Sequence, residues 1–219
     1  MENESNEKKP LSMAEWVFYT VVGLVFVGIL MSIGPGAFRC GPISAEKIKA
    51  TSNARNIALA LNQYATDHDG EFPKGKTALE VFSQLLPPSV SASGYIIDKS
   101  MFFVKGSQYT PKPITGGDPI KLAARENHWG VMGNLKDDDK ANPRWPLVFD
   151  GPATPDGRYS SYAKQKGGRW EGKVAIVVRL DCSAKAERLT DLQVKTDGQE
   201  NVLQPSTTWM PEGKLLMPY

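Results

Sequence analysis

Residues 8–33 read KKPLSMAEWVFYTVVGLVFVGILMSI, and they decide the first half of the fold prediction. A short basic tip and a single glutamate, Glu15, precede an apolar run, and the next charged residue is Arg39. A helix rises about 1.5 Å per residue, so a helix over this run nearly spans a hydrocarbon core of about 30 Å. Backbone groups in lipid must pair within their own segment, which makes a helix the expected form. The sequence therefore predicts a transmembrane helix over residues 14–36, which follows a tip of residues 1–13.

A cleaved secretory signal is the alternative interpretation of the same run. The apolar part of a signal usually covers about 7–15 residues and ends at a small-residue cleavage site. The run here is longer, and residues 34–41, GPGAFRCG, contain no A-x-A pattern. The length therefore favours an anchor. Charges flanking the run do not decide its orientation, because long domains cross membranes largely regardless of nearby Lys and Arg residues.

The composition of the 219 residues is that of one globular domain joined to the apolar run. The formal net charge is +2, with 41% hydrophobic and 23% charged residues. No run of Lys and Arg is interleaved with aromatic residues, so nucleic-acid binding is not expected. We predict a linker over 37–43, one domain over 44–195 and a tail over 196–219.

Residues 53–73 read NARNIALALNQYATDHDGEFP and predict the main helix of that domain. Ser44 is a favourable N-cap residue, and Gly70 lies where the end of a helix is expected. Between them, small and apolar residues recur at steps of three and four, the period of one helix face: Ala54, Ile57, Ala58, Leu61, Tyr64 and Ala65. We therefore predict a helix over 44–66.

The later periodic segments predict a second helix and a small sheet. The second helix is expected over 77–86, where Leu and Phe residues recur and two prolines follow. Short apolar runs bounded by Gly, Pro and Asp predict strands at 101–104, 128–132, 146–149, 173–180 and 187–194. The predicted fold class is therefore α+β, with a transmembrane helix followed by a helix packed on a small antiparallel sheet.

The segment that opens the apolar run resembles the start of type IV pilins and type II secretion pseudopilins. In that family a basic tip and a glycine precede a cleavage point, and four residues then lead to a glutamate. Here Lys8 and Lys9 form the tip, and Leu11-Ser12-Met13-Ala14 leads to Glu15. Pro10 stands where the family has glycine, and proline fixes φ and lacks an N–H. A peptidase that selects glycine is therefore expected to reject this site.

Residues 53–73 carry a second resemblance. They are similar to a segment of pseudopilin-like proteins from some environmental bacteria, in which an N-x-R-x-I-x-x-A-L-x-x-Y helix leads into D-x-x-G-x-F-P. Later blocks resemble the same group in the same order, at residues 94–106, 126–130, 143–150 and 167–189. The resemblance implies a pilin-like fold.

The resemblance also implies a non-enzymatic subunit of a type II secretion or type IV pilus-like assembly. Such proteins keep the basic tip in the cytoplasm, the helix in the bacterial inner membrane and the C-terminal domain in the periplasm. The implied partners are the membrane and other pilin-like subunits or secretion-system proteins, copies of this chain included. Glu15 would pair with the terminal amine of a neighbouring subunit, or would only mark the interfacial start of the helix. Gly23 and Gly28 would let two such helices approach closely.

Pro10 keeps a second function open. Without processing, the chain would stay a single-pass, membrane-tethered binding or scaffold domain of the same fold that does not polymerise. Glycines and prolines between residues 34 and 42 fit this version, because they uncouple the helix from the domain.

The sequence contains no familiar catalytic motif, so we expect no enzymatic activity. There are two histidines, and a nucleophile elbow, a P-loop and a paired C-x-x-C motif are all missing. A dyad of Cys182 with His128 would have no third group to orient it. Cys40 and Cys182 either form a disulfide, if the domain lies in an oxidising compartment, or remain two unconnected thiols.

Calcium is the one ligand that the residues suggest. Asp67, Asp69 and Glu71 supply carboxylates at alternate positions around Gly70, and Ca²⁺ prefers oxygen ligands. The alternative for the same residues is a polar cap at the end of the preceding helix. No other cofactor is expected.

Overall fold

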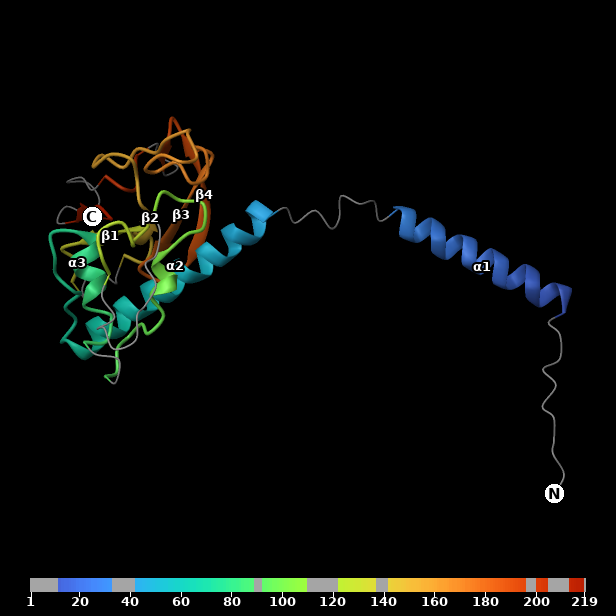
Figure 1. Ribbon diagram of the computed structural model, residues 1–219, viewed down its shortest axis with the longest axis horizontal. Coiled ribbons are helices and arrows are strands. Elements are labelled where there is room, and N and C mark those ends of the chain that lie inside the picture. Colours follow the sequence, from blue (N-terminus) through green and yellow to red (C-terminus); the bar gives the residue numbers. More distant parts are fainter. Residues whose placement is uncertain are drawn as a thin grey trace, which may run out of the picture. The chain divides into compact units, whose positions relative to one another are not determined.

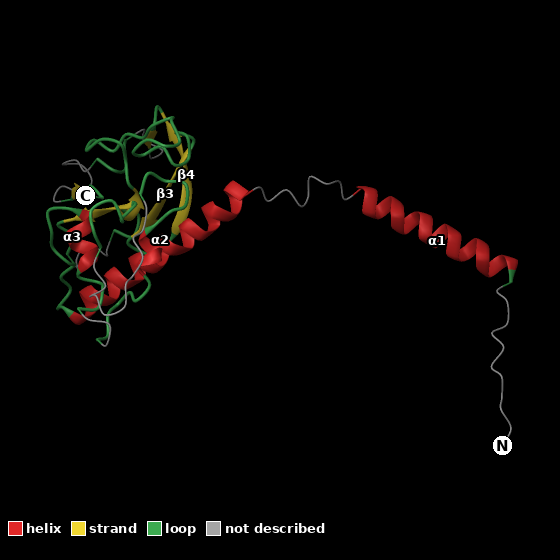
Figure 2. Ribbon diagram, viewed as in Figure 1, coloured by secondary structure: helices red, strands yellow, loops and turns green. Residues whose placement is uncertain are grey.

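The computed structural model describes residues 12–32, 42–88, 92–109, 122–136, 142–195, 200–204 and 213–218. The chain forms two compact units, Met1–Ile43 and Ser44–Tyr219. The first unit contains helix α1, and the second contains nearly all of helix α2, the shorter helices and the strands of the sheet (Figures 1 and 2).

Helix α1 covers Met13–Ser32 and corresponds to the apolar run of the sequence. Residues 33–36 of the predicted span lie outside the described residues. Among the residues that the structure describes, no helix is long and apolar enough to span a membrane. The transmembrane helix over 14–36 is therefore wrong as a part of the fold class.

Helix α2 covers Pro42–Asp67, with 26 residues, and includes the helix predicted over 44–66. Its buried stripe consists of small residues and two large apolar ones: Ala50, Ala54, Ile57, Ala58, Ala60, Leu61 and Ala65. The helix ends near the predicted glycine. The N–H of Gly70 donates to the carbonyl oxygen of Ala65 at 2.8 Å, and Gly70 has φ +85°, the left-handed conformation that favours glycine.

Two short helical elements follow. Helix α3 covers Ala78–Ser83 and begins at Thr77, whose side chain accepts a hydrogen bond from the N–H of Glu80 at 3.2 Å. The 3₁₀ helix η1 covers Lys99–Phe102, where the sequence predicted a strand. The Asp98 side chain caps η1 by accepting from the amide two residues further on at 2.8 Å. Such local bonds compete with strand pairing, which explains the wrong prediction.

The sheet of the second unit has six strands, all antiparallel, in the order β5-β4-β3-β2-β1-β6. Their bounds are Trp129–Gly133 for β1, Pro146–Asp150 for β2, Val174–Arg179 for β3, Ala184–Thr190 for β4, Gln193–Val194 for β5 and Lys214–Leu216 for β6. Strands β1 to β5 are neighbours in the order in which the sequence supplies them. Strand β6 returns to the other edge of the sheet and pairs with β1, with Leu216 opposite Val131.

This sheet overturns the rest of the predicted fold class. It is an antiparallel half-barrel with few helices, rather than a small sheet under one helix. Strands β1, β2 and β3 lie close to their predicted places, but β4 begins at Ala184, and β6 falls in the predicted tail over 196–219. Strand β4 reads AKAERLT and β6 reads KLL, so neither has the apolar run that marks a buried strand.

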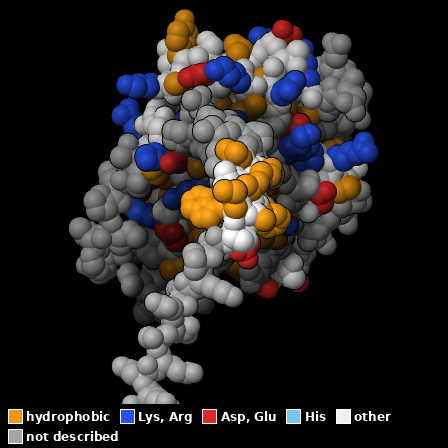
Figure 3. Space-filling view, turned by 90° about the vertical axis from the view of Figure 1, so that its right-hand side faces the viewer, with side chains coloured by type: hydrophobic (Ala, Val, Ile, Leu, Met, Phe, Trp, Pro, Cys, Tyr) orange, Lys and Arg blue, Asp and Glu red, His pale blue; other side chains and the backbone are white. Residues whose placement is uncertain are grey.

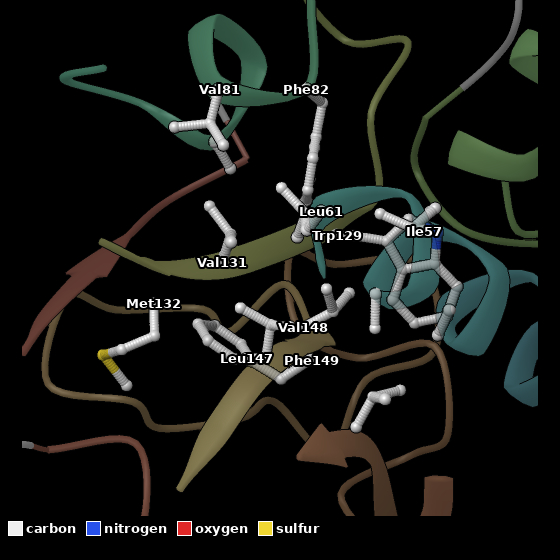
Figure 4. Packing of buried hydrophobic residues seen from close by; sticks show 14 of the residues in the cluster. Ile57, Leu61, Val81, Phe82, Trp129, Val131, Met132, Leu147, Val148 and Phe149 are labelled. Carbon is white, nitrogen blue, oxygen red and sulfur yellow. The ribbon is translucent and has the colours of Figure 1, made fainter. Parts of the chain in front are cut away.

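The core of the second unit gathers side chains from α2, α3 and the sheet. Figure 4 shows Ile57 and Leu61 of α2 near Trp129 of β1, with Phe82 of α3 beside them. A Cβ atom at Gly130 would collide with the Phe149 ring of the neighbouring strand. Burial of these apolar groups is the main term that stabilises the unit.

Candidate functional site

Helix α1 exposes a large apolar surface. The exposed apolar side chains of its described part lie all along it: Met13, Trp16, Val17, Phe18, Tyr19, Val21, Val22, Leu24 and Val25. Figure 3 turns the α1 side of Figure 1 toward the viewer and shows hydrophobic side chains on the surface of the helix. Apolar residues on every face are typical of a helix that is buried on all sides. Helix α1 is therefore a candidate association site.

The first turn of α1 gives Glu15 a local role. The Glu15 Oε2 atom accepts a hydrogen bond from the N–H of Ser12 at 2.8 Å, and the N–H of Glu15 donates to Ser12 Oγ at 3.3 Å. This reciprocal pair is a capping box, which satisfies two amide groups at the helix start. The hydrogen bond from the Ser12 backbone lowers the pKa of Glu15, so the carboxylate stays charged. Pairing with a neighbouring subunit's amine stays a prediction.

The two glycines of α1 differ in what the structure describes. A Cβ atom at Gly23 would meet no atom within 4 Å, so no contact within the described chain requires a glycine there. Gly28 lies within the helix, but its surroundings fall outside the described side chains. The close-approach role predicted for both glycines stays a prediction.

The turn after α2 does not gather the predicted calcium ligands. Asp67 Oδ2 accepts a hydrogen bond from Tyr95 Oη at 3.0 Å, and Asp69 is exposed with φ +51°. Glu71 Oε2 lies 2.5 Å from Lys74 Nζ, and this bond lowers the pKa of Glu71. In the described part of the chain, no group of three His, Cys, Asp or Glu side chains is arranged to hold a metal ion. These carboxylates belong to the turn that ends α2.

Cys40 lies outside the described residues, so its disulfide with Cys182 stays a prediction. Cys182 has φ +60° in the turn between β3 and β4, and its Sγ accepts a hydrogen bond from Asn62 Nδ2 at 3.2 Å. Burial raises the pKa of this thiol. The thiol is therefore protonated, and it is hydrogen-bonded to Asn62 of α2.

A cluster of buried polar side chains lies where β1 and β2 meet. His128 directly precedes β1, Asp150 ends β2, and His128 Nε2 lies 2.6 Å from Asp150 Oδ1. The other carboxylate oxygen, Oδ2, accepts from Trp170 Nε1 at 2.7 Å and from the N–H of Ile176 at 2.6 Å. The backbone oxygen of Asp150 accepts from Tyr159 Oη at 2.7 Å. One residue thus ties together β1, β2, β3 and the segment between β2 and β3.

The surroundings of this cluster are closed. The rings of Tyr109 and Trp129 pack edge-on against the His128 ring, with centroids 5.8 and 5.0 Å away. The space beside the His128–Asp150 pair has no volume that a water molecule can occupy. Burial raises the pKa of Tyr159 well above 10, and the charge of Asp150 adds to this effect. In the part of the chain that the structure describes, the pair and its hydrogen bonds hold β1, β2 and β3 together.

The Cys182–His128 dyad considered from the sequence does not form. His128 is bonded to Asp150, and Cys182 is bonded to Asn62. The buried His128–Asp150 pair was not expected from the sequence, although Asp150 ends the otherwise apolar segment PLVFD. A carboxylate that follows four apolar residues without a break is the signal that marks it.

No family model, no curated protein and no solved structure matches this chain. The sites described above therefore carry the functional proposal by themselves.

Proposed function

We propose that the chain is a non-enzymatic subunit of a secretion or pilus-type assembly, of the pseudopilin kind, and that α1 joins it to its neighbours. In this proposal the assembly lies at the bacterial inner membrane. The partners are the corresponding helices of other subunits, including copies of the same chain.

The observation that carries the proposal is the exposed apolar surface of α1. Water contact with so many large apolar side chains costs about 25 cal/mol for each Å² of surface. Covering them with the apolar helices of other subunits removes that cost, and helices associate in this way through close packing of their side chains. The open surroundings of Gly23 allow a partner helix to approach the backbone there.

Site-specific photo-crosslinking in the full chain tests the proposal. A benzoylphenylalanine residue replaces Leu24 of α1, which is 67% exposed, and the chain is produced in a bacterium and irradiated. The matched control replaces Ile97 of the second unit, which is 69% exposed. We expect a ladder of crosslinked copies from position 24 and none from position 97. Monomer alone from both positions, with α1 helical, contradicts the proposal.

A substitution at Gly23 sharpens the same experiment. Gly23→Ile fills the open space on the helix and should reduce crosslinking from position 24 several-fold, because the helices can no longer approach closely. Isoleucine favours a helix more than glycine does, so lost crosslinks cannot arise from an unfolded α1. Val22→Ile is the control, since it adds one methylene group at a neighbouring position and should leave the ladder intact.

A tethered binding or scaffold domain that does not polymerise is the second candidate, and Pro10 favours it. Proline at the position of the expected glycine is incompatible with the usual cleavage, so the chain would keep its basic tip. The intact mass of the protein from its native membrane separates the two. Loss of residues 1–10 with a methylated Leu11 amine supports assembly, whereas a mass that retains Lys8–Pro10 supports the tethered domain.

A further inference from the structure

A groove runs between the first half of α2 and the start of β4, and we call it the β4 groove. Its volume is about 690 Å³. Its residues come from α2 and from the β3–β4 turn with the start of β4: Lys47, Ile48, Thr51, Ser52, Arg55, Asp181, Cys182, Ser183, Ala184 and Ala186. Ile48 is exposed, and the alanines of β4 project little. The groove therefore has a largely apolar floor that is open to solvent.

Strand β4 borders this groove with an unpaired edge. Its partner β5 pairs only with Leu189 and Thr190, so residues 184–188 have a neighbouring strand on one side alone in the part of the chain that is described. The N–H of Leu189 donates to Lys173 at 3.1 Å, which fixes the alternation of the antiparallel ladder.

By that alternation, the backbone groups of Lys185 and Glu187 face β3. The N–H and C=O groups of Ala184, Ala186 and Arg188 face away from it, toward the open edge. A row of such groups is the surface to which an extended segment adds as a further strand.

The charges around the groove indicate which charge an added strand should carry. Asp181 contributes one negative charge to the groove, and its carboxylate accepts a hydrogen bond from the N–H of Ser183 at 2.8 Å. Lys47 and Arg55 line the α2 wall, and neither forms an ion pair with another described residue. A segment that pairs with β4 would direct every second side chain toward this wall.

Strand β4 carries exposed basic side chains on both of its faces. Glu187 Oε1 lies 2.6 Å from Arg179 Nη1, so its charge is already compensated. Lys185 and Arg188 are exposed. A second copy of β4 would bring the same two cations to the edge, and like charges across strands destabilise pairing. The surplus positive charge therefore favours an acidic strand as the occupant.

We propose that β4 binds an extended, acidic segment of a partner protein by strand addition, with alternate carboxylates against Lys47 and Arg55. Backbone bonds from Ala184, Ala186 and Arg188 hold the segment, and the groove receives its inward side chains. This surface belongs to the second unit alone and does not depend on the role proposed for α1.

Binding of two synthetic probes to the full chain in a mild non-ionic detergent tests this proposal. One fluorescent heptapeptide alternates Glu and Val, and the other alternates Lys and Val. We expect the Glu peptide to bind at least about tenfold more tightly, and its affinity to fall as salt rises, because exposed charges are screened. Equal affinities for the two peptides, or binding of neither, overturn the proposal.

Two pairs of variants locate the binding. Ala186→Pro removes an outward N–H without removing a bond to β3, so the fold should persist while affinity for the Glu peptide falls at least about tenfold. Ala186→Ser keeps the N–H and is the control. Arg55→Glu should lower the affinity in the same way, whereas Lys164→Glu, an exposed change outside the groove, should not.

Amide hydrogen exchange gives a readout at the strand itself. Without peptide, the amides of Ala186 and Arg188 should exchange quickly, and those of Lys185 and Glu187 slowly. The Glu peptide should slow the first pair and leave the second pair unchanged. Slow exchange at Ala186 and Arg188 of the native chain without peptide, together with a dimer that Ala186→Pro abolishes, would assign the edge to a second copy and overturn the proposal.

Discussion

Helices α1 and α2 are the two long helices of the described residues, and their apolar residues are distributed in opposite ways. Helix α2 concentrates them on one stripe, where Ala54, Ile57 and Ala58 are fully buried. Helix α1 carries them on all sides, and those described, such as Val21 and Leu24, are exposed. The core supplies a partner for α2 within the chain. In our proposal, the partners of α1 are the helices of other subunits.

The difference shows that the spacing of apolar residues along a helix indicates which of its faces are covered by other parts of the structure. A stripe at steps of three and four predicts packing against one surface, and α2 has that surface in the sheet. An apolar residue at almost every position predicts cover on all sides, which a single neighbouring domain cannot supply. Stability changes should therefore follow substitutions in the Ser44–Tyr219 unit, and association changes should follow substitutions in α1.

The largest loss of stability is expected from Asp150→Ala. The change leaves Trp170 Nε1, the N–H of Ile176 and the His128 ring without their acceptor inside the sheet. Buried donors that lose a charged partner cost about 3–5 kcal/mol in the free energy of unfolding. Urea unfolding of the full chain in non-ionic detergent, followed by tryptophan fluorescence, measures this loss.

Asp191→Asn is the matched control for that experiment. Asp191 pairs with Lys195 at 3.3 Å on the surface, and its side chain is 79% exposed. Asparagine tolerates the local φ of +52°, so the change should stay within about 0.5 kcal/mol. Similar losses from both substitutions would show that the buried hydrogen bonds of Asp150 stabilise the fold no more than a surface ion pair does.

Ile57→Ala and Val21→Ala test the comparison of the two helices directly. Ile57 is fully buried, so its truncation should lower the free energy of unfolding by about 2–5 kcal/mol. Val21 is 53% exposed, and its truncation should change that quantity by less than about 0.5 kcal/mol. The same urea experiment measures both. A large effect from Val21→Ala would mean that α1 contributes to the core, and the comparison would fail.

Alkaline pH offers a smaller and more specific test within the second unit. The raised pKa of buried Tyr159 means that the folded chain keeps a proton which the unfolded chain loses above about pH 10. The stabilisation is thus complete below that pH and falls as pH rises, by up to about 1.4 kcal/mol per pH unit.

Tyr159→Phe isolates this contribution. The variant loses the hydrogen bond to the Asp150 carbonyl, which costs about 1 kcal/mol at neutral pH. Its unfolding free energy should then fall less steeply than that of the native chain between pH 10 and 11.5. If the unfolding free energies of the two chains fell equally steeply with pH, Tyr159 would not contribute to the alkaline loss of stability.

Ser12→Ala should have the smallest effect, and only on α1. The substitution breaks the capping box with Glu15 and costs about 1 kcal/mol of helix stability. Circular dichroism should show a small loss of helix, whereas the urea midpoint of the second unit should not move. Ser12→Asp, which preserves a capping side chain, should restore the signal. A shifted urea midpoint in Ser12→Ala would mean that α1 contributes to the stability of the second unit.

Local patterns predicted much of the second unit. The three- and four-residue steps located α2, and the run KVAIVVRL located β3 at the centre of the sheet. Strand β6 and the first part of β4 escaped prediction, because their stability comes from pairing with β1 and β3 and not from an apolar run of their own. The predicted strand over 101–104 became η1 because the Asp98 side chain caps it locally.

The candidate sites were harder to predict than the elements. The alternating carboxylates Asp67, Asp69 and Glu71 suggested a metal site, but two of them are bonded to Tyr95 and Lys74. The His128–Asp150 pair depends on contacts between residues that are far apart in the sequence, and no local spacing encodes it.

The arrangement of β6 has a consequence for the order in which the chain acquires its structure. Strands β1 to β5 can assemble one after another as synthesis delivers them, since each pairs with its predecessor. The outer side of β1 must wait for Lys214–Leu216, which arrive long after it. During that interval β1 presents a bare, apolar edge to other chains, which is a hazard for nascent domains. A chaperone that shields this edge until the last strand arrives would raise the yield of folded protein.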